Sequence, residues 1–453
     1  MKKVCFIIVC LCIFTIFMTG CEKKDPLDPR NPVTLSMWHN FGGDMQRTMD
    51  MLIDEFNATV GRERGVIISV DAITSSAELQ QTLNMIVNDD PGAPDMPDIT
   101  TAYPRTAIQF QSKGMLSNFD DYFSERELTA YIPAFIEEGR LGDEGLYVFP
   151  FAKSTEILFV NQTLFDRFAA ATGFTIDSLA TFEGIAEASI RYYQWVDELT
   201  PNIQNDGKQF YTADSWINMA QAGMLQLGDE LFHNETLAFD NAAYRHIWET
   251  TFAPAVQGGF AIFNGYSSDL ARTGDIVCST GSSAGILFYG DTITHPDNTT
   301  EQVEYSILPF PVFEGGDKIA IQRGNGLIVG KSTNQREYAA ALFVKWFTEP
   351  NQNMRFVAET GYLPVTHEAF EQHMPQAVNT AENPRIRQML RAVTEMYTSY
   401  DFFVPPAFDA FDGISRNYES RYRALMIQER EVYLTGRPVD QAAALATFGN
   451  SLR

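Results

Sequence analysis

Residues 33–56 read VTLSMWHNFGGDMQRTMDMLIDEF, and the two halves of this stretch have different hydrophobic periods. Val33, Leu35 and Met37 alternate with polar residues, which is the period of a β-strand. From Met45 to Phe56 the apolar residues recur at the spacing of one helix face. The stretch therefore predicts a strand followed by an amphipathic helix.

The same order repeats twice further along the chain. Residues 66–70 predict a second strand, and Ser75 with Glu78 has the spacing of a capping box at the start of a second helix. A third strand near Ile99 leads to Pro104, which suits the first turn of a third helix. This alternation predicts a parallel sheet with covering helices, which binds ligands beyond the C-terminal ends of its strands. Those ends are the loops at 38–43, 72–76 and 102–105.

A second α/β section is predicted after residue 155. Residues 157–160 have the character of a buried strand, and aromatic-rich helical stretches fill 182–256. Another buried strand is expected at 327–329, and the tail from about 408 is predicted to be helical. With 453 residues, 45% of them hydrophobic, the chain is long enough for two or three domains.

The N-terminus has the features of a bacterial lipoprotein signal. Lys2 and Lys3 precede an apolar run from 4 to 18, and Thr19-Gly20-Cys21 follows it. We expect residues 1–20 to be removed, Cys21 to carry lipid, and residues 21–32 to form a proline-rich tether. An ordinary cleaved signal or an uncleaved anchor is the alternative.

Composition narrows the class of protein. A formal net charge of −25 disfavours nucleic acid as a partner, because nucleic acid requires a basic surface. Once the signal and Cys21 are set aside, Cys278 is the remaining cysteine, and we predict that it is a buried thiol without a disulfide. The six histidines have no metal-ligand spacing, so neither a metal nor a cofactor is expected.

A family resemblance lies in three stretches: LSMWHNFGG at 35–43, FPFAKSTEILFVNQTLF at 149–165 and GNGLIVGKSTNQREYAAALFVKWFTEPNQNMRFVAETGYLPVT at 324–366. Together they resemble family 1 extracellular solute-binding proteins, the class of maltose- and glycerol-3-phosphate-binding proteins. NPRIRQML at 383–390 and REVYLTGRP at 430–438 are most similar to the glycerol-phosphate branch.

The resemblance implies a two-lobed α/β protein of the type II periplasmic-binding-protein fold. Each lobe would be a mostly parallel sheet with covering helices, and the lobes would close on a ligand in the cleft. Lobe 1 is expected at 33–152 plus about 314–366, and lobe 2 at about 153–313 plus 367–453. The segments that cross between the lobes are expected at 153–160, 311–314 and 363–366.

The implied function is that of the substrate-binding component of an ABC importer. The protein would capture a small polar solute, either a carbohydrate or a glycerol-phosphate-type compound, and deliver it to the permease transmembrane subunits. It would be an exported monomer at the periplasmic or extracellular face, attached to a membrane by the lipid alone. The sequence leaves open the ligand class and the membrane.

Several ligand contacts follow from the resemblance. Ser154 at a crossover and Ser282 and Ser283 in a Ser/Gly-rich loop would offer hydroxyls, and Tyr362 would offer a phenol that has both an apolar face and a donor. Each has a structural alternative. A serine hydroxyl can satisfy local backbone, and Tyr362 can make the hydrophobic contact at a helix end.

The remaining candidates have other roles. The resemblance puts Arg423 in the cleft, where its guanidinium suits phosphate, although Glu419 is placed for an ion pair along a helix. Gly324 would let backbone N–H groups approach a ligand closely, or it forms a plain turn. Aromatic side chains could stack on a sugar face, and the best placed are Trp38, Phe182 and Trp216.

Two rival functions remain. GSSAG at 281–285 fits the nucleophile elbow of a serine hydrolase, and His295 and His367 follow it in the chain. No HGGG-type oxyanion segment precedes it. A surface lipoprotein or adhesin without a small ligand is the other rival. We expect a binding protein and no enzyme.

Overall fold

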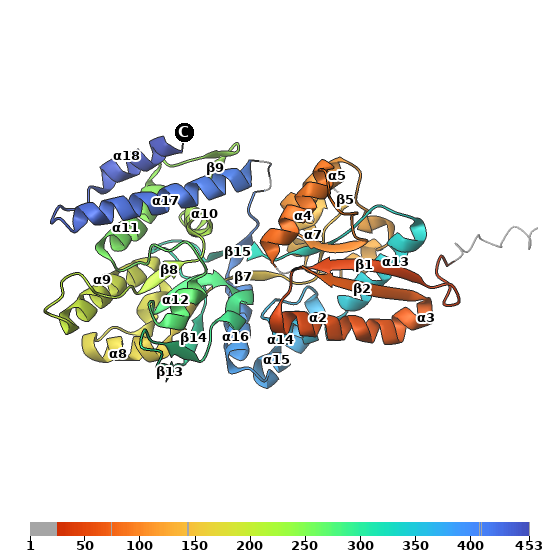
Figure 1. Cartoon of the computed structure of the whole chain (residues 1–453), viewed down its shortest axis with the longest axis horizontal. Coiled ribbons are helices and arrows are strands. Elements are labelled where there is room, and N and C mark those ends of the chain that lie inside the picture. Colours follow the sequence, from red (N-terminus) through yellow and green to blue (C-terminus); the bar gives the residue numbers. More distant parts are fainter. Residues whose placement is uncertain (1–24, 74, 143–144, 407, 409, 453) are drawn as a thin grey trace, which may run out of the picture.

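The computed structural model describes residues 25–73, 75–142, 145–406, 408 and 410–452, which form two lobes lying side by side (Figure 1). Each lobe contains its own sheet, covered by helices, so the predicted two-lobed α/β fold is confirmed. The signal peptide and the proposed lipid site Cys21 lie outside the described residues.

The first lobe has a five-stranded sheet in the order β2-β1-β3-β16-β6. Its strands are β1 (Val33–His39), β2 (Val66–Ala72), β3 (Ile99–Ala102), β6 (Phe149–Pro150) and β16 (Gly326–Val329). The three N-terminal strands are parallel, as predicted, whereas β16 runs antiparallel to β3. The residues that alternate on β1 and recur on α2 (Gly43–Phe56) are buried in the core.

The other elements of this lobe surround the sheet. They are η1 (Asn57–Gly61), α3 (Arg62–Arg64), α4 (Ser76–Asn88), α5 (Pro104–Ser112), η2 (Phe119–Asp121), α6 (Glu125–Leu128), α7 (Pro133–Glu138), the hairpin β4 (Arg140–Leu141) and β5 (Gly145–Leu146), α13 (Asn334–Phe347) and α14 (Pro350–Thr360).

The second lobe has a six-stranded sheet in the order β17-β15-β7-β11-β8, with β14 paired to β7. The strands are β7 (Ser154–Asn161), β8 (Tyr211–Ala213), β11 (Cys278–Ser282), β14 (Tyr305–Leu308), β15 (Ile319–Arg323) and β17 (Asp401–Phe403). The sheet is mixed because β7 runs antiparallel to β11, β14 and β15. Every residue of β7 is buried, in agreement with the unbroken apolar pattern of 157–160.

Helices and short hairpins make up the rest of the described structure, most of them around this second sheet (Figure 1). They are α8 (Gln162–Thr172), η3 (Ile176–Ala180), α9 (Phe182–Leu199), α10 (Trp216–Gln226), β9 (Phe232–His233), β10 (Thr236–Leu237), α11 (Ala242–Gln257), α12 (Ser267–Thr273), η4 (Ser283–Phe288), β12 (Thr292–Thr294), β13 (Thr300–Gln302), η5 (Ala369–His373), α15 (Met374–Thr380), α16 (Pro384–Ser399), α17 (Phe411–Tyr433) and α18 (Gln441–Ser451).

The chain crosses between the lobes at 323–326. β15 pairs with β7 in the second sheet, and β16 pairs with β3 in the first. Gly324 allows the crossing because its φ is +109° and a Cβ there would lie 2.5 Å from the carbonyl oxygen of Ala152. The chain also crosses between β6 and β7, where Lys153 and Leu363 exchange backbone hydrogen bonds.

The crossing predicted at 311–314 is wrong. Phe313 packs on Phe182 with ring centroids 4.6 Å apart, and the Phe182 N–H donates to the Val312 carbonyl, all within the second lobe. Sheet pairing also puts β15 in the second lobe, whereas the predicted boundary near 314 would put it in the first. The other lobe boundaries stay predictions.

Cys278 on β11 is a buried free thiol, as predicted, and burial raises its pKa well above the ordinary value. Within the described ranges, none of the helices is long and apolar enough to span a membrane.

Candidate ligand-binding cleft

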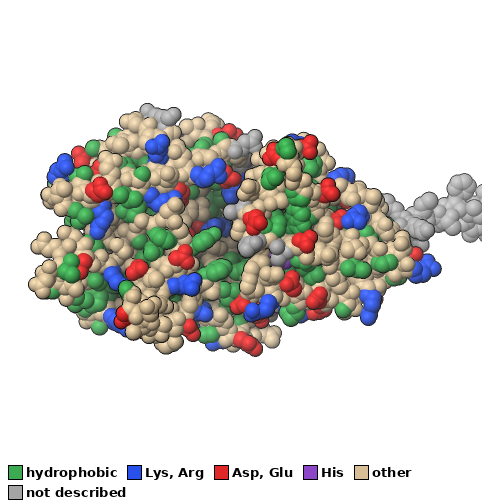
Figure 2. All heavy atoms as spheres, in the orientation of Figure 1, with side chains coloured by type: hydrophobic (Ala, Val, Ile, Leu, Met, Phe, Trp, Pro, Cys, Tyr) green, Lys and Arg blue, Asp and Glu red, His purple; other side chains and the backbone are tan. Residues whose placement is uncertain are grey.

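A cleft of about 2560 Å³ lies between the lobes. Figure 2 shows the surface hollowed at this junction. The three predicted strand-end loops of the first sheet all contribute to its wall, through residues 40–43, Ser75 and residues 103–105. Its volume exceeds the roughly 300–1,000 Å³ of most small-molecule pockets, so the lobes stand apart in this structure.

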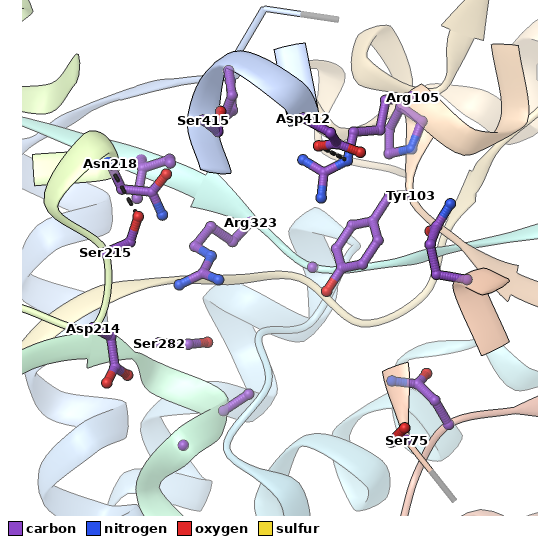
Figure 3. Close-up of a pocket in the computed structure, with 18 of the residues that line it drawn as sticks. Ser75, Tyr103, Arg105, Asp214, Ser215, Asn218, Ser282, Arg323, Asp412 and Ser415 are labelled. Carbon is purple, nitrogen blue, oxygen red and sulfur yellow. Dashed lines mark hydrogen bonds and ion pairs between the residues drawn. The ribbon is translucent and has the colours of Figure 1, made fainter. Parts of the chain in front are cut away.

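Arg323, the last residue of β15, lies at the centre of the cleft (Figure 3). Its Nη1 lies 3.0 Å from Oε1 of Glu156 on β7, and Nδ2 of Asn218 donates to the same oxygen at 2.8 Å. The Glu156 side chain is 1% exposed, whereas that of Arg323 is 33% exposed. Arg323 therefore connects the ligand space to a buried carboxylate.

The environment of this pair shifts both pKa values. Burial raises the pKa of Glu156, and the nearby charge of Arg323 opposes that shift. Burial alone would lower the pKa of Arg323, but the carboxylate of Glu156 raises it overall, with smaller contributions from Tyr103 and Asp214. Arg323 is thus a cation whose charge is balanced within the protein.

Tyr362 also lines the cleft, directly after the end of α14. Its ring lies 5.9 Å from that of Phe356 and 5.9 Å from that of Phe41, measured between centroids. Burial is the main cause that raises the pKa of Tyr362 far above the ordinary value of 10.0. The phenol therefore stays protonated, and its O–H can donate a hydrogen bond to a ligand.

Arg423 combines both roles that the sequence left open. It lines the cleft, and its Nη1 lies 2.7 Å from Oε2 of Glu419, one helical turn earlier on α17. The other oxygen of Glu419 accepts hydrogen bonds from the Ser215 hydroxyl at 3.1 Å and the Ile217 N–H at 3.0 Å, at the start of α10. The ion pair is therefore built into the wall of the second lobe.

One ion pair joins the two walls. Nε of Arg105, on α5 of the first lobe, lies 3.0 Å from Oδ1 of Asp412, on α17 of the second (Figure 3). The guanidinium of Arg105 also lies 5.1 Å from the ring centroid of Tyr103. Both side chains of the ion pair remain partly exposed to water.

The structure brings part of the predicted site together. Ser282, Gly324, Tyr362 and Arg423 line the cleft. Five other candidates are not among its lining residues.

Two of these are serines behind the wall. Ser154 and Ser283 are buried, and the Thr155 N–H points to the Ser283 hydroxyl at 3.5 Å. The third, Trp38, packs on the small hydrophobic cluster of the first lobe around Leu79 and Leu83.

Two aromatic predictions need correction. Phe182 is fully buried between Phe310 and Phe313, and Trp216 packs on Tyr422 in the core of the second lobe. Both residues are the first of their helix, with a capping Thr or Ser just before them. The cap fixes the direction in which each helix starts, and in both helices this turns the aromatic side chain inward.

The sequence missed the aromatics that are exposed. Tyr266 is 75% exposed and Phe288 is 61% exposed, and both line the cleft. Gly265 before Tyr266 is a loop signal, but hydrophobic periodicity treats any aromatic as a core residue. The sequence also missed Arg323. The clearest signal that it lies in the cleft is its position directly before the glycine turn at Gly324.

The GSSAG segment does not form a nucleophile elbow. An elbow exposes its serine, whereas Ser283 is fully buried. His295 is paired with Glu301, and among the hydrogen bonds of the described residues none joins a histidine to Ser282 or Ser283. Among the residues that the structure describes, no group of His, Cys, Asp and Glu is suited to hold a metal ion.

Comparison with known proteins gives a consistent family. A sequence model described as bacterial extracellular solute-binding protein matches residues 51–385. A comparison with curated proteins gave no match.

Three solved structures have a similar fold and are 14–18% identical to this chain, so they bear on the fold alone. The cyclic alpha-maltosyl-1,6-maltose binding protein of Arthrobacter globiformis has a TM-score of 0.69 and 17% identity, over 93% of this chain and 98% of that one. UgpB from Mycobacterium tuberculosis, in complex with glycerophosphocholine, has a TM-score of 0.69 and 18% identity, with the same coverage of 93% and 98%. An ABC substrate-binding protein from Listeria monocytogenes, in complex with cycloalternan, has a TM-score of 0.67 and 14% identity, again over 93% and 98%.

Proposed function

This chain belongs to the bacterial extracellular solute-binding proteins, and from that premise we propose that its interlobe cleft captures a hydroxyl-rich solute of the carbohydrate type for an ABC importer. The observation that carries the proposal is the cleft at the lobe junction, which has polar and aromatic side chains from both lobes on its walls. A solute that touches both walls stabilises the closed arrangement, whereas one that touches a single wall does not.

The chemistry of the cleft favours a carbohydrate over a phosphate compound. Tyr266 and Phe288 offer exposed rings on which the apolar face of a sugar can stack. Arg423 next to Glu419 offers a donor beside an acceptor, which suits hydroxyl groups. Two of the similar structures are named for or contain oligosaccharides, and one contains glycerophosphocholine, so the fold alone supports either class.

A screen of ligands tests the proposal. We expect neutral oligosaccharides such as maltotriose to raise the melting temperature more than glycerol 3-phosphate or glycerophosphocholine at equal concentration. The best compound should also reduce the radius of gyration of the protein in small-angle scattering. In calorimetry, Tyr266→Ala should lower the affinity for that compound about tenfold.

Leu199→Ala is the matched control, because Leu199 is also a strongly exposed apolar residue, at 63%, but lies outside the cleft. A scattering radius that stays constant at saturation contradicts closure. A preference for the phosphate compounds contradicts the carbohydrate class.

We propose in addition that the protein works at the outer side of a membrane, held by lipid on Cys21, and passes its solute to the permease as a monomer. The Thr19-Gly20-Cys21 sequence and the family support this. Cells that express Cys21→Ala should lose incorporation of a fatty-acid analogue into the protein. Incorporation equal to that of the wild type contradicts the lipid site.

A further inference from the structure

The arginines of the inner cleft are each paired with a carboxylate. Arg105 pairs with Asp412 and Arg423 with Glu419, and these partners are reached by some solvent. The partner of Arg323 differs, because the Glu156 side chain is buried, with 1% of it exposed. Among the ion pairs of the described residues, Glu156 has no cation other than Arg323. Arg323 therefore presents a partly exposed guanidinium to the cleft above a buried carboxylate.

We propose that Arg323 contacts the ligand and that Glu156 is a specificity-determining residue, which balances the charge of Arg323 so that the cleft floor accepts an uncharged, oxygen-rich group and rejects a phosphate. This rests on the proposed function, since it concerns the ligand of the same cleft. Glu156 itself acts through Arg323 and is a positioning residue.

The strands hold the pair rigidly. Arg323 is on β15 and Glu156 on β7, and these strands pair antiparallel with Arg323 opposite Ser154. On its other side Glu156 is opposite Ser282 of β11, a cleft residue. Nη1 is used by Glu156, and the remaining N–H groups of a guanidinium can donate elsewhere. A ligand oxygen therefore meets a donor that is already oriented.

The charges around Arg323 disfavour an anion. Figure 3 shows Asp214 and Ser282 near the guanidinium, on the side of the second lobe. Asp214 has one oxygen bound to the Ser267 N–H at 2.8 Å, and its charge acts on Arg323 in the same direction as that of Glu156. One cation thus faces two carboxylates, so a phosphate would gain little, whereas a hydroxyl can accept from Arg323 and donate to Asp214.

The cleft has other cations besides these three arginines. Arg140, Arg272 and Arg416 also line the cleft. Arg140 is paired with Asp120, whereas Arg272 and Arg416 are exposed to water. Water and salt screen exposed charges strongly, so these arginines do not make up for the positive charge of Arg323 that the carboxylates balance. A double variant that also replaces Arg323 distinguishes its contribution from that of the other arginines.

Inorganic phosphate is the probe, followed by ³¹P NMR and calorimetry. Glu156→Gln keeps the shape and the hydrogen bond to Asn218 but frees the charge of Arg323. We expect it to bind phosphate at least roughly tenfold more tightly than the wild type, because one carboxylate charge close to the anion is gone. Glu156→Gln with Arg323→Gln should lose that gain.

Glu55→Gln is the matched control. Glu55 pairs with Arg355 at 2.7 Å on the outside of the first lobe, so this variant changes the net charge equally and also breaks an ion pair. Its phosphate affinity should equal that of the wild type. A purely structural role for Glu156 predicts no gain of phosphate binding in any variant, and that result overturns the inference.

A further variant covers the case in which Glu156→Gln does not fold, which circular dichroism would show. Arg323→Gln alone should not strengthen phosphate binding, because it leaves the carboxylates of Glu156 and Asp214 without their cation. Tight phosphate binding by the wild type that disappears in Arg323→Gln overturns the inference.

The two proposals fail in different ways. If the wild type binds phosphate through Arg323, the charge argument is wrong, while the protein can still be a solute-binding protein for a phosphate compound. If no neutral sugar binds or closes the lobes, the proposed function is wrong whatever the phosphate titrations give.

Discussion

Asp98 connects three segments of the first lobe through one carboxylate. Its oxygens accept from the Ser36 N–H at 2.8 Å, the Ser36 hydroxyl at 3.0 Å, and Nε and Nη2 of Arg336 at 2.7 and 2.6 Å. Burial alone would raise its pKa, but the hydrogen bonds from Arg336 and Ser36 lower it overall. β1, the residue before β3, and α13 are held together by this group.

We predict that Asp98→Asn lowers the free energy of unfolding by about 2 kcal/mol at neutral pH, since it removes charge-assisted bonds that water partly screens. A carboxylate with a lowered folded pKa stabilises fully above its unfolded pKa, and loses that contribution as pH falls through the folded pKa. The difference in the free energy of unfolding between wild type and variant should therefore shrink as the pH falls below 3.8, the ordinary pKa of an aspartate. Urea unfolding at several pH values measures it.

Asp95→Asn is the control, because Asp95 is exposed in the same loop. Its free energy of unfolding should stay within about 0.5 kcal/mol of the wild type. An equal loss in both variants, or a gap for Asp98→Asn that persists at low pH, contradicts the assigned role of the ion pair.

At the level of the elements, the end of α14 determines how closely the two lobes approach. Gly361 ends the helix with φ at +80°, and a Cβ there would lie 2.6 Å from Cγ2 of Ile286 and 3.0 Å from the carbonyl oxygen of Ser283. Both atoms belong to η4 of the second lobe. The glycine therefore allows α14 of one lobe to pack directly against η4 of the other, just before the cleft residue Tyr362.

Gly361→Ala should lower the free energy of unfolding by about 2 kcal/mol or more, through left-handed strain and a forced separation from η4. It should also weaken binding of the best sugar from the screen, because Tyr362 moves with the helix end. Thermal unfolding and calorimetry measure the two effects.

Gly173→Ala separates the two causes. Gly173 ends α8 with φ at +82°, and a Cβ there meets nothing within 4 Å. It should carry the backbone strain of about 1 kcal/mol without the loss of ligand affinity. Equal effects of the two variants on affinity would contradict the close approach at Gly361.

For the whole molecule, the relation between the lobes depends in part on the Arg105–Asp412 ion pair, which spans the cleft. Partly exposed pairs contribute about 1 kcal/mol or less. Asp412→Asn should therefore shift the ligand-free population toward wider separation by at most about fivefold, and the shift should fade at high salt. Distances between spin labels placed on the two lobes measure it.

Glu431→Gln is the control, as Glu431 is an exposed acid on the same helix α17. Its distance distribution should match that of the wild type at every salt concentration. A distribution for Asp412→Asn that also matches the wild type at low salt contradicts a role for the ion pair in lobe separation.

The sequence by itself determined the local elements and the family. The alternation on β1, the helical spacing on α2 and the glycine at the end of α14 are properties of neighbouring residues, so they can be seen without a structure. The order of strands and helices also identified the loops that reach the cleft, because the C-terminal ends of parallel strands share one edge of a sheet.

Only the tertiary structure decided which side chains face the ligand. Phe182 and Trp216 are buried while Tyr266 and Phe288 are exposed, although all four are aromatic residues of the second lobe. Arg323 and Glu156 are 167 residues apart in the chain and 3.0 Å apart in space. Periodicity reports the face of one element, whereas burial and charge balance arise from the packing of several elements, which no local pattern contains.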